Sequence, residues 1–88
     1  MKRTRLSVWM TAHNKAFGKT LRTLRKAHGY TQETLAFESG LDRTYVSLLE
    51  LGSRSPTLDT MMTLCGALNV SLSQLAQKVE AEIGGLRQ

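Results

Sequence analysis

The sequence predicts an all-α fold of five helices, and three observations support this. Apolar residues recur every three or four positions through most of the 88-residue chain, as they do along one face of an amphipathic helix. Residue types that cap or end helices separate these apolar segments. No alternating run of apolar and polar residues indicates a strand. A chain of this length holds one domain with one modest core.

The first helix is expected over about residues 14–28, because apolar residues recur there at helical spacing and Gly29 follows as a C-terminal glycine. The residues before it, 1–13, are expected to form a basic N-terminal arm. Thr31 is a suitable N-cap for a second helix, which ends at Gly40.

The third helix is expected over about residues 42–51, with Asp42 as its cap. A loop with the single proline of the chain, residues 52–56, comes after it. Thr57 caps the fourth helix. Residues 71–74 have the S-x-x-Q form of a capping box, so a fifth helix begins there and is expected to end at Gly84-Gly85.

Residues 31–50 have the layout of a helix-turn-helix, with two short amphipathic helices joined by a turn around Gly40. In the second of these helices Val46 and Leu49 are expected to face inward. The outward side then carries Arg43, Thr44, Ser47 and Leu48. A helix-turn-helix places its second helix in the major groove of DNA. The motif therefore predicts binding to double-stranded DNA.

The net charge of +5 is unevenly distributed. Eight of the twelve basic residues precede Glu33, the first acidic residue, and seven acidic residues outnumber the four basic residues in the remainder. A basic N-terminal third favours contact with a polyanion on one face, although a solubilising surface is the alternative interpretation.

Several other classes of protein are disfavoured. The apolar run at residues 6–10 is shorter than the ~7–15 residues of a signal-peptide core, and no stretch approaches the ~18 apolar residues of a membrane span. Cys65, the single cysteine, is expected to be a buried thiol in a reducing cytoplasm. His13, His28 and Cys65 match no zinc-binding spacing. We expect a cytoplasmic protein without membrane contact, metal, cofactor or catalytic set.

Residues 16–76 resemble the Cro/C1-type (XRE) helix-turn-helix family. The resemblance is carried, in order, by Arg25, Gly29, Thr31-Gln32, Leu35-Ala36, Gly40, Glu50, Gly52, Pro56, Leu64, Ala67-Leu68 and Leu75. Residues 43–47 and 55–58 look most like the controller proteins of restriction–modification systems. The resemblance implies a five-helix, lambda-repressor-like domain over residues 14–76. Leu51 departs from the family, which usually has a polar or basic residue there.

Arg43 is the expected principal base reader, because a guanidinium at the start of a recognition helix can form two parallel hydrogen bonds with guanine. Thr44 and Ser47 lie on the same predicted face. Tyr45 either packs against the second helix or reaches the DNA. Leu48 can contact thymine methyl groups, but an apolar residue at this spacing more often packs.

Phosphate contacts position such a protein on the duplex. Gln32 lies in the first turn of the second helix, where free N–H groups favour an anion, and the resemblance implies a phosphate contact for it. Thr31 is foremost a cap and is also a candidate phosphate contact. Ser53 and Arg54 are expected to bind phosphates at the other rim of the groove. Lys19 and Arg22 either add looser phosphate contacts or form a solvated face.

The resemblance also implies that Arg25 and Glu50 pair and hold the recognition helix at its angle. The apolar stripe of the fifth helix continues to Val79 and Ile83, so residues 77–88 are expected to form a homodimer interface.

We therefore expect a sequence-specific transcriptional regulator that binds a palindromic operator as a dimer, with autoregulation as a further expectation. An antitoxin-type protein-interaction module that binds its own operator secondarily is the alternative. RNA binding is disfavoured, since Tyr30 and Tyr45 are isolated and form no stacking platform.

Overall fold

The computed structural model describes the backbone of residues 5–87 and the side chains of residues 12–85. This part of the chain forms five α-helices and no strand, which confirms the predicted all-α class. The helices are α1 (Arg5–Ala27), α2 (Gln32–Ser39), α3 (Arg43–Leu51), α4 (Leu58–Leu68) and α5 (Leu72–Arg87). None of these helices combines the length and the apolar character needed to cross a membrane.

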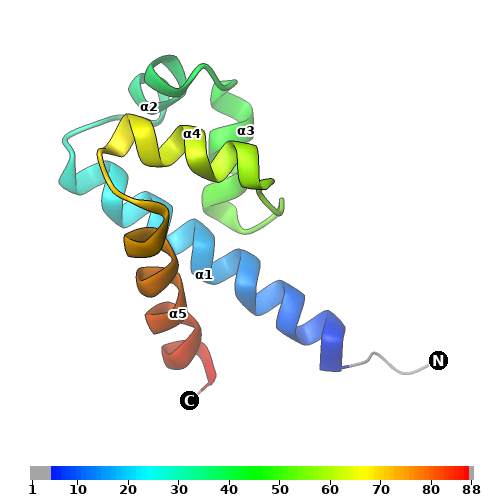
Figure 1. Cartoon of the computed structure of the whole chain (residues 1–88). Helices are drawn as coiled ribbons and strands as arrows, with labels where there is room; N and C mark the ends of the chain where they lie inside the picture. Colours follow the sequence, from blue (N-terminus) through cyan, green and yellow to red (C-terminus); the bar gives the residue numbers. More distant parts are fainter. Residues whose placement is uncertain (1–4, 88) are drawn as a thin grey trace.

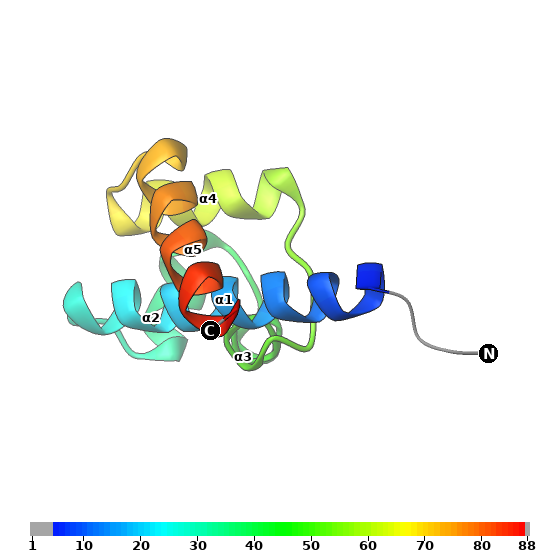
Figure 2. The same cartoon turned by 90° about the horizontal axis from the view of Figure 1, so that it is seen from below.

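The longest helix, α1, runs diagonally across the molecule, with α2, α3 and α4 above it and α5 extending below it (Figure 1). The view from below shows that the N-terminal turns of α1 extend beyond the other helices (Figure 2). Helix α1 packs against both α3 and α5, while α2 packs against α3 and α4. The second and third helices are therefore held between α1 on one side and α4 on the other.

One hydrophobic core joins all five helices. The side chains that are almost fully buried within it are Leu21 of α1, Leu35 of α2, Val46 and Leu49 of α3, and Leu64 of α4. Leu75 of α5 is buried against the same cluster. Since each helix gives at least one large apolar side chain, the position of α3 depends on the packing of the whole domain.

The predicted helix starts are confirmed by hydrogen bonds. The hydroxyl oxygens of Thr31 and Thr57 each accept a hydrogen bond, 3.0 Å long, from the backbone N–H three residues later. In the capping box, the Ser71 N–H donates to Gln74 Oε1 at 2.8 Å, and the Gln74 N–H donates to Ser71 Oγ at 3.0 Å. These local interactions satisfy N–H groups that the helices leave free at their first turns.

Two predicted helix ends are wrong. The sequence pattern predicts a start of the first helix near Asn14, whereas α1 begins at Arg5, so residues 5–13 of the predicted arm are helical. No proline or glycine lies between Arg5 and Ala16 to interrupt that backbone. Helix α5 continues through Gly84-Gly85 to Arg87, because glycine permits a left-handed end without enforcing one.

Candidate nucleic-acid interface

The turn between α2 and α3 has the form that a helix-turn-helix requires. Gly40 ends α2 with φ of 70°, a left-handed conformation in which a side chain would be strained. The Leu41 N–H donates to the Ala36 carbonyl at 2.9 Å. Asp42 then caps α3 by accepting a hydrogen bond from the Thr44 N–H at 2.9 Å. The two caps fix the direction in which α3 leaves the turn.

Helix α3 has one buried and one outward side. Val46 and Leu49 are fully buried in the core, as the sequence pattern predicts. Arg43 and Thr44 are exposed, and Ser47 is half-buried. Together with Gln32, these three residues line a shallow hollow of about 230 Å³, here called the reading hollow. The structure thus brings one predicted phosphate-binding residue beside three predicted base readers.

A buried hydrogen-bonded network holds the end of α3 against α1 and α2. Arg25 Nε donates to Glu50 Oε2 at 2.6 Å, and Arg25 Nη2 donates to Glu50 Oε1 at 3.1 Å. The side chains of Arg25 and Glu50 are 9% and 5% exposed. A third donor of the guanidinium, Nη1, bonds the Tyr30 carbonyl at 2.9 Å. The predicted structural pair is present, and it is bidentate.

Gln32 joins the same network. Its Nε2 donates to Glu50 Oε1 at 3.0 Å. A carboxamide NH₂ group has two donors, so one is used by Glu50 and the other can bond an oxygen of a ligand. The side chain of Gln32 therefore connects the recognition helix to the start of α2, where free N–H groups attract an anion.

Tyr45 does not line the reading hollow. Its ring packs against the core cluster, and its hydroxyl oxygen lies 3.4 Å from Thr60 Oγ1 of α4. Of the two roles that the sequence leaves open for Tyr45, this arrangement favours packing. A base contact from Tyr45 stays a prediction.

Ser53 and Arg54 are exposed in the loop after α3, in a position that would suit contacts with the backbone of a ligand beside this helix. Among the described residues, Arg22, Arg43 and Arg54 form no ion pair, whereas Arg25 pairs with Glu50 and Lys19 with Glu82. Three guanidinium groups are therefore available to an anion.

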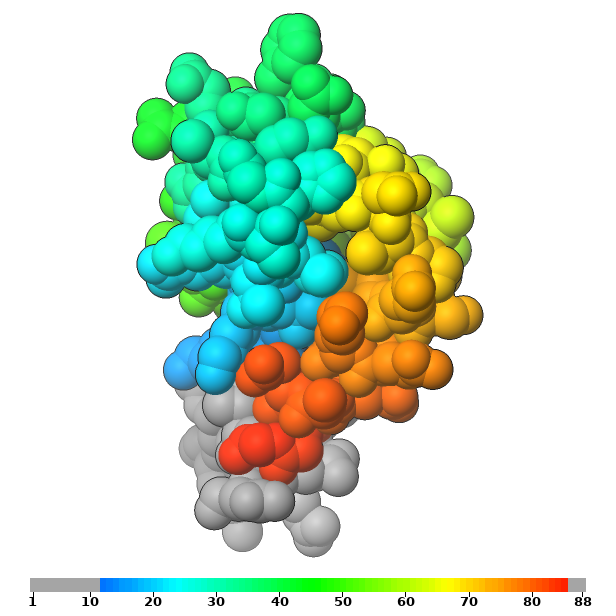
Figure 3. Space-filling model, turned by 90° about the vertical axis from the view of Figure 1, so that its left-hand side faces the viewer, coloured from blue at the N-terminus to red at the C-terminus, as the bar shows by residue number. Residues whose placement is uncertain are grey.

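Arg22 and Lys19 have different surroundings. Arg22 lines a second, polar hollow of about 250 Å³ with Gln32, Ser47, Glu50 and Leu51. Its proximity to α3 is not visible in the sequence, because it depends on how α1 crosses α3. Lys19 Nζ instead lies 3.5 Å from Glu82 Oε1, where α5 (orange to red) lies against α1 (blue to cyan) in Figure 3.

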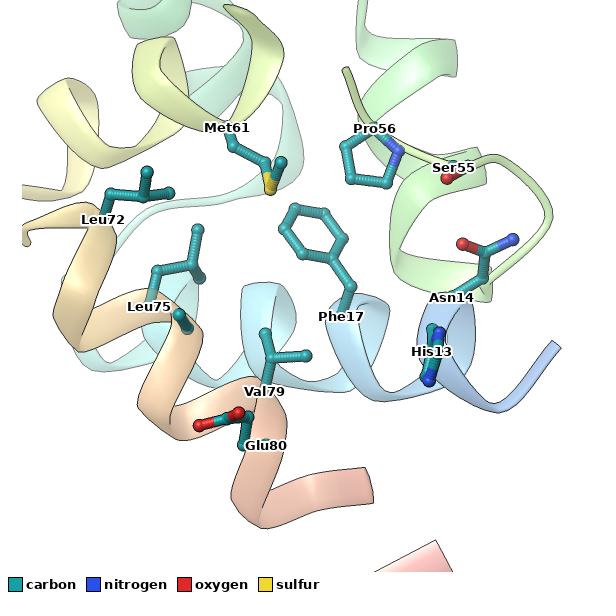
Figure 4. A pocket seen from close by; sticks show the side chains of 11 residues that line it. His13, Asn14, Phe17, Ser55, Pro56, Met61, Leu72, Leu75, Val79 and Glu80 are labelled. Carbon is teal, nitrogen blue, oxygen red and sulfur yellow. The ribbon is translucent and has the colours of Figure 1, made fainter. Parts of the chain in front are cut away.

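A separate apolar groove of about 360 Å³ lies between α1, α4, α5 and the loop before α4. Phe17 of α1, Met61 of α4, and Leu72 and Val79 of α5 point into it (Figure 4). Ser55 and His13 lie at one end, Leu72 lies at the other, and Glu80 lies next to Val79 (Figure 4). Ile83 lines a neighbouring hollow with His13 and Glu80. The two predicted dimer residues thus border one continuous region of the surface.

The remaining candidate residues for chemistry do not gather. Cys65 is buried in α4, and burial raises the pKa of its thiol. His28 lies just after the end of α1 and packs its ring on Tyr30, with the ring centroids 4.4 Å apart. Within the described part of the chain, no three His, Cys, Asp or Glu residues are grouped so that they could hold a metal ion.

Comparison with known proteins gives consistent matches. A helix-turn-helix family model matches residues 21–75. Control protein C.MunI from a Mycoplasma species is 37% identical over 67 residues, which cover 75% of this chain and 90% of C.MunI.

Two solved structures extend the comparison. The restriction–modification controller protein C.AhdI from Aeromonas hydrophila is 48% identical with a TM-score of 0.68, over 69% of this chain and 92% of that chain. The controller protein C.Esp1396I, solved as a tetramer in complex with its natural 35-base-pair operator, is 32% identical with a TM-score of 0.74, over 81% of this chain and 93% of that chain.

Proposed function

Because the chain belongs to the Cro/C1-type helix-turn-helix family, we propose that it is a sequence-specific transcriptional regulator of the restriction–modification controller type. Its ligand is double-stranded DNA, and its action is binding without catalysis. The related controller that was solved on its operator supports this choice of ligand.

The reading hollow is the observation that carries the proposal. Recognition of a duplex needs phosphate contacts for position and base-edge contacts for sequence. Gln32, at the start of α2, offers an amide donor, and Arg43 and Thr44, at the start of α3, offer groups suited to base edges. The Glu50 carboxylate lies at the end of α3 and accepts a hydrogen bond from Gln32. This bond fixes the phosphate-contacting group on α2 relative to the base-contacting groups on α3.

Selection of bound sequences from random duplex DNA tests the proposal. We expect an inverted repeat whose half-sites lie about one DNA turn, ~34 Å, apart. If the protein binds selected and unselected duplexes with equal affinity at fixed salt, as a generic basic domain would, sequence-specific binding is refuted.

We further propose that two copies bind the operator as a two-fold symmetric dimer. A palindromic site matches a two-fold pair, which is the commonest symmetry of small assemblies. The apolar groove and the adjoining Ile83 offer the required surface, in which Val79 and Leu72 are half-buried. One related controller, C.Esp1396I, was solved as a tetramer on its operator, which supports assembly.

Ala76 provides a clean test of the dimer, because it lines the groove yet is itself exposed. Ala76→Glu should leave the fold intact and shift sedimentation from dimer to monomer. Gln77→Glu makes a comparable charge change at an exposed position of the same helix that does not line the groove, and it should leave the dimer unchanged. A wild-type monomer at tens of micromolar, with and without operator, would exclude the dimer.

A further inference from the structure

Two leucines share the outward side of α3 with the predicted base readers. A helix repeats every 3.6 residues, so residues four and seven apart lie on one side. Leu51 is four residues after Ser47 and seven after Thr44, while Leu48 is four after Thr44. The first half of this face is therefore polar, and its second half is apolar.

Neither leucine belongs to the hydrophobic core cluster formed by the described residues. Leu51 is 69% exposed. Leu48 is half-buried, but it is absent from the partly buried hydrophobic residues that pack against the core cluster. On the opposite side of the same helix, Val46 and Leu49 are fully buried. Leu48 is therefore placed where a ligand on the outward side of α3 could reach it, and its contact with thymine methyl groups stays a prediction.

The surroundings of Leu51 are those of the interface. It lines the second, polar hollow with Arg22, Gln32 and Ser47. An apolar side chain in such a place is hydrated in the free protein and loses that water only when a ligand covers the face. In the proposed function the ligand that covers it is the major groove of DNA.

Only one group on the base edges of the major groove is apolar, the C5-methyl group of thymine. We propose that Leu48 and Leu51 form an apolar pair that reads thymine methyl groups in the part of each half-site that the second half of α3 reaches. Leu51 lies ~10 Å further along the helix than Thr44, at 1.5 Å per residue. The pair therefore reads different base pairs from those that Arg43 reads. This inference rests on the proposed function.

Replacing thymine by deoxyuridine in the selected operator tests the inference, since deoxyuridine keeps every hydrogen-bonding group and loses only the methyl. Each replacement is made at the same position in both half-sites. For wild-type protein, at least one such replacement should weaken binding about fourfold per half-site. A fourfold change is equivalent to ~0.8 kcal/mol, the value for burying one carbon group. In Leu48→Ala or Leu51→Ala the same replacement should change affinity less than twofold. Leu48→Met retains apolar volume and should keep the effect.

Leu58→Ala is the matched control, because Leu58 is an exposed leucine (59%) that belongs to another helix, α4. Its sensitivity to the replacements should equal that of wild type, whatever its effect on overall affinity. Thermal unfolding of each variant separates a loss of folding from a loss of methyl recognition.

The two levels of the proposal fail in different ways. If wild-type protein binds its selected operator but no methyl removal weakens binding, or if both alanine variants keep the full effect, methyl reading is overturned and the proposed function stands. If no operator is selected at all, both are overturned.

Discussion

Gly18 of α1 lies directly against the end of the recognition helix, at the backbone of Glu50. A Cβ atom built on Gly18 would lie 2.5 Å from the carbonyl oxygens of both Leu49 and Glu50. No side chain can enter this space, since the neighbouring atoms are backbone. The absence of a side chain at Gly18 therefore lets α1 support α3 at close range, next to the Arg25–Glu50 pair.

Gly18→Ala should lower the free energy of unfolding by about 1–3 kcal/mol or more, because the two helices must move apart to admit a methyl group. Gly66→Ala is the control: Gly66 is also helical, nothing lies within 4 Å of its added Cβ, and the change should stabilise by about 0.5–1 kcal/mol. Urea unfolding of both variants measures the difference. Equal effects at the two glycines would contradict the close approach of the two helices.

Glu50→Ala should cost about 3–5 kcal/mol of stability, since it leaves the buried Arg25 guanidinium without its carboxylate. Glu50→Gln keeps an oxygen that can accept from Arg25, so it should cost less. Both variants are compared by urea unfolding in the absence of DNA. If Glu50→Ala and Glu50→Gln lower the stability equally, the hydrogen bonds from Arg25 to this position do not stabilise α3 against α1.

Arg43→Ala should weaken binding to a selected operator by about 1–3 kcal/mol, the usual worth of a bidentate base contact. Binding to unselected duplex should change little, and stability should be unchanged because Arg43 is exposed. Arg54→Ala, in the loop, should instead weaken both kinds of binding to a similar extent. The measurement is the ratio of the two affinities at fixed salt. An unchanged ratio in Arg43→Ala would make Arg43 a phosphate contact.

Arg22→Gln should flatten the salt dependence of DNA affinity, with the log–log slope reduced by about 0.9 for each phosphate that the variant no longer neutralises. Lys19→Gln removes the same charge from α1, but Lys19 lies beside Glu82 rather than beside α3, so its effect should be smaller. Affinity measured over a series of salt concentrations gives both slopes. A larger change for Lys19→Gln would place the DNA on the other side of α1.

Cys65 should react slowly with thiol reagents in the native protein, because burial raises its thiol pKa and the thiolate is the reactive form. A raised folded-state pKa means that the native state holds the proton more tightly. The resulting stabilisation is present below the ordinary thiol pKa of 9.0 and is lost as pH rises above it. Labelling with Ellman's reagent, with and without urea, compares the reactivity of the Cys65 thiol in the native and unfolded states. Rapid labelling of native protein would contradict the burial.

Local signals in the sequence account for most of the fold. The caps at Thr31, Asp42 and Thr57 and the box at residues 71–74 are predictable, because a cap depends on neighbours within three residues. The inward positions of α3 are predictable because helical periodicity alone determines them. Neither kind of feature requires knowledge of the remaining chain.

The features that sequence reasoning misses depend on packing between helices. Gly18 looks like an interruption of a helix until α1 is placed against α3. Arg22 looks like any surface cation until the same crossing brings it beside Ser47. Tyr45 is ambiguous by spacing, and its packing on the core and its proximity to Thr60 depend on where α4 lies.

The hydrogen bond from Gln32 Nε2 to Glu50 Oε1 has a consequence for the thermodynamics of recognition. A flexible glutamine that contacts a phosphate would lose rotamer entropy when DNA arrives, and that loss would subtract from affinity. Here Gln32 is already ordered in the free protein by a carboxylate that Arg25 holds in place. Preorganisation of this kind transfers the entropy cost from binding to folding, so loss of the Gln32–Glu50 bond alone would lower affinity without changing the contacts made with DNA.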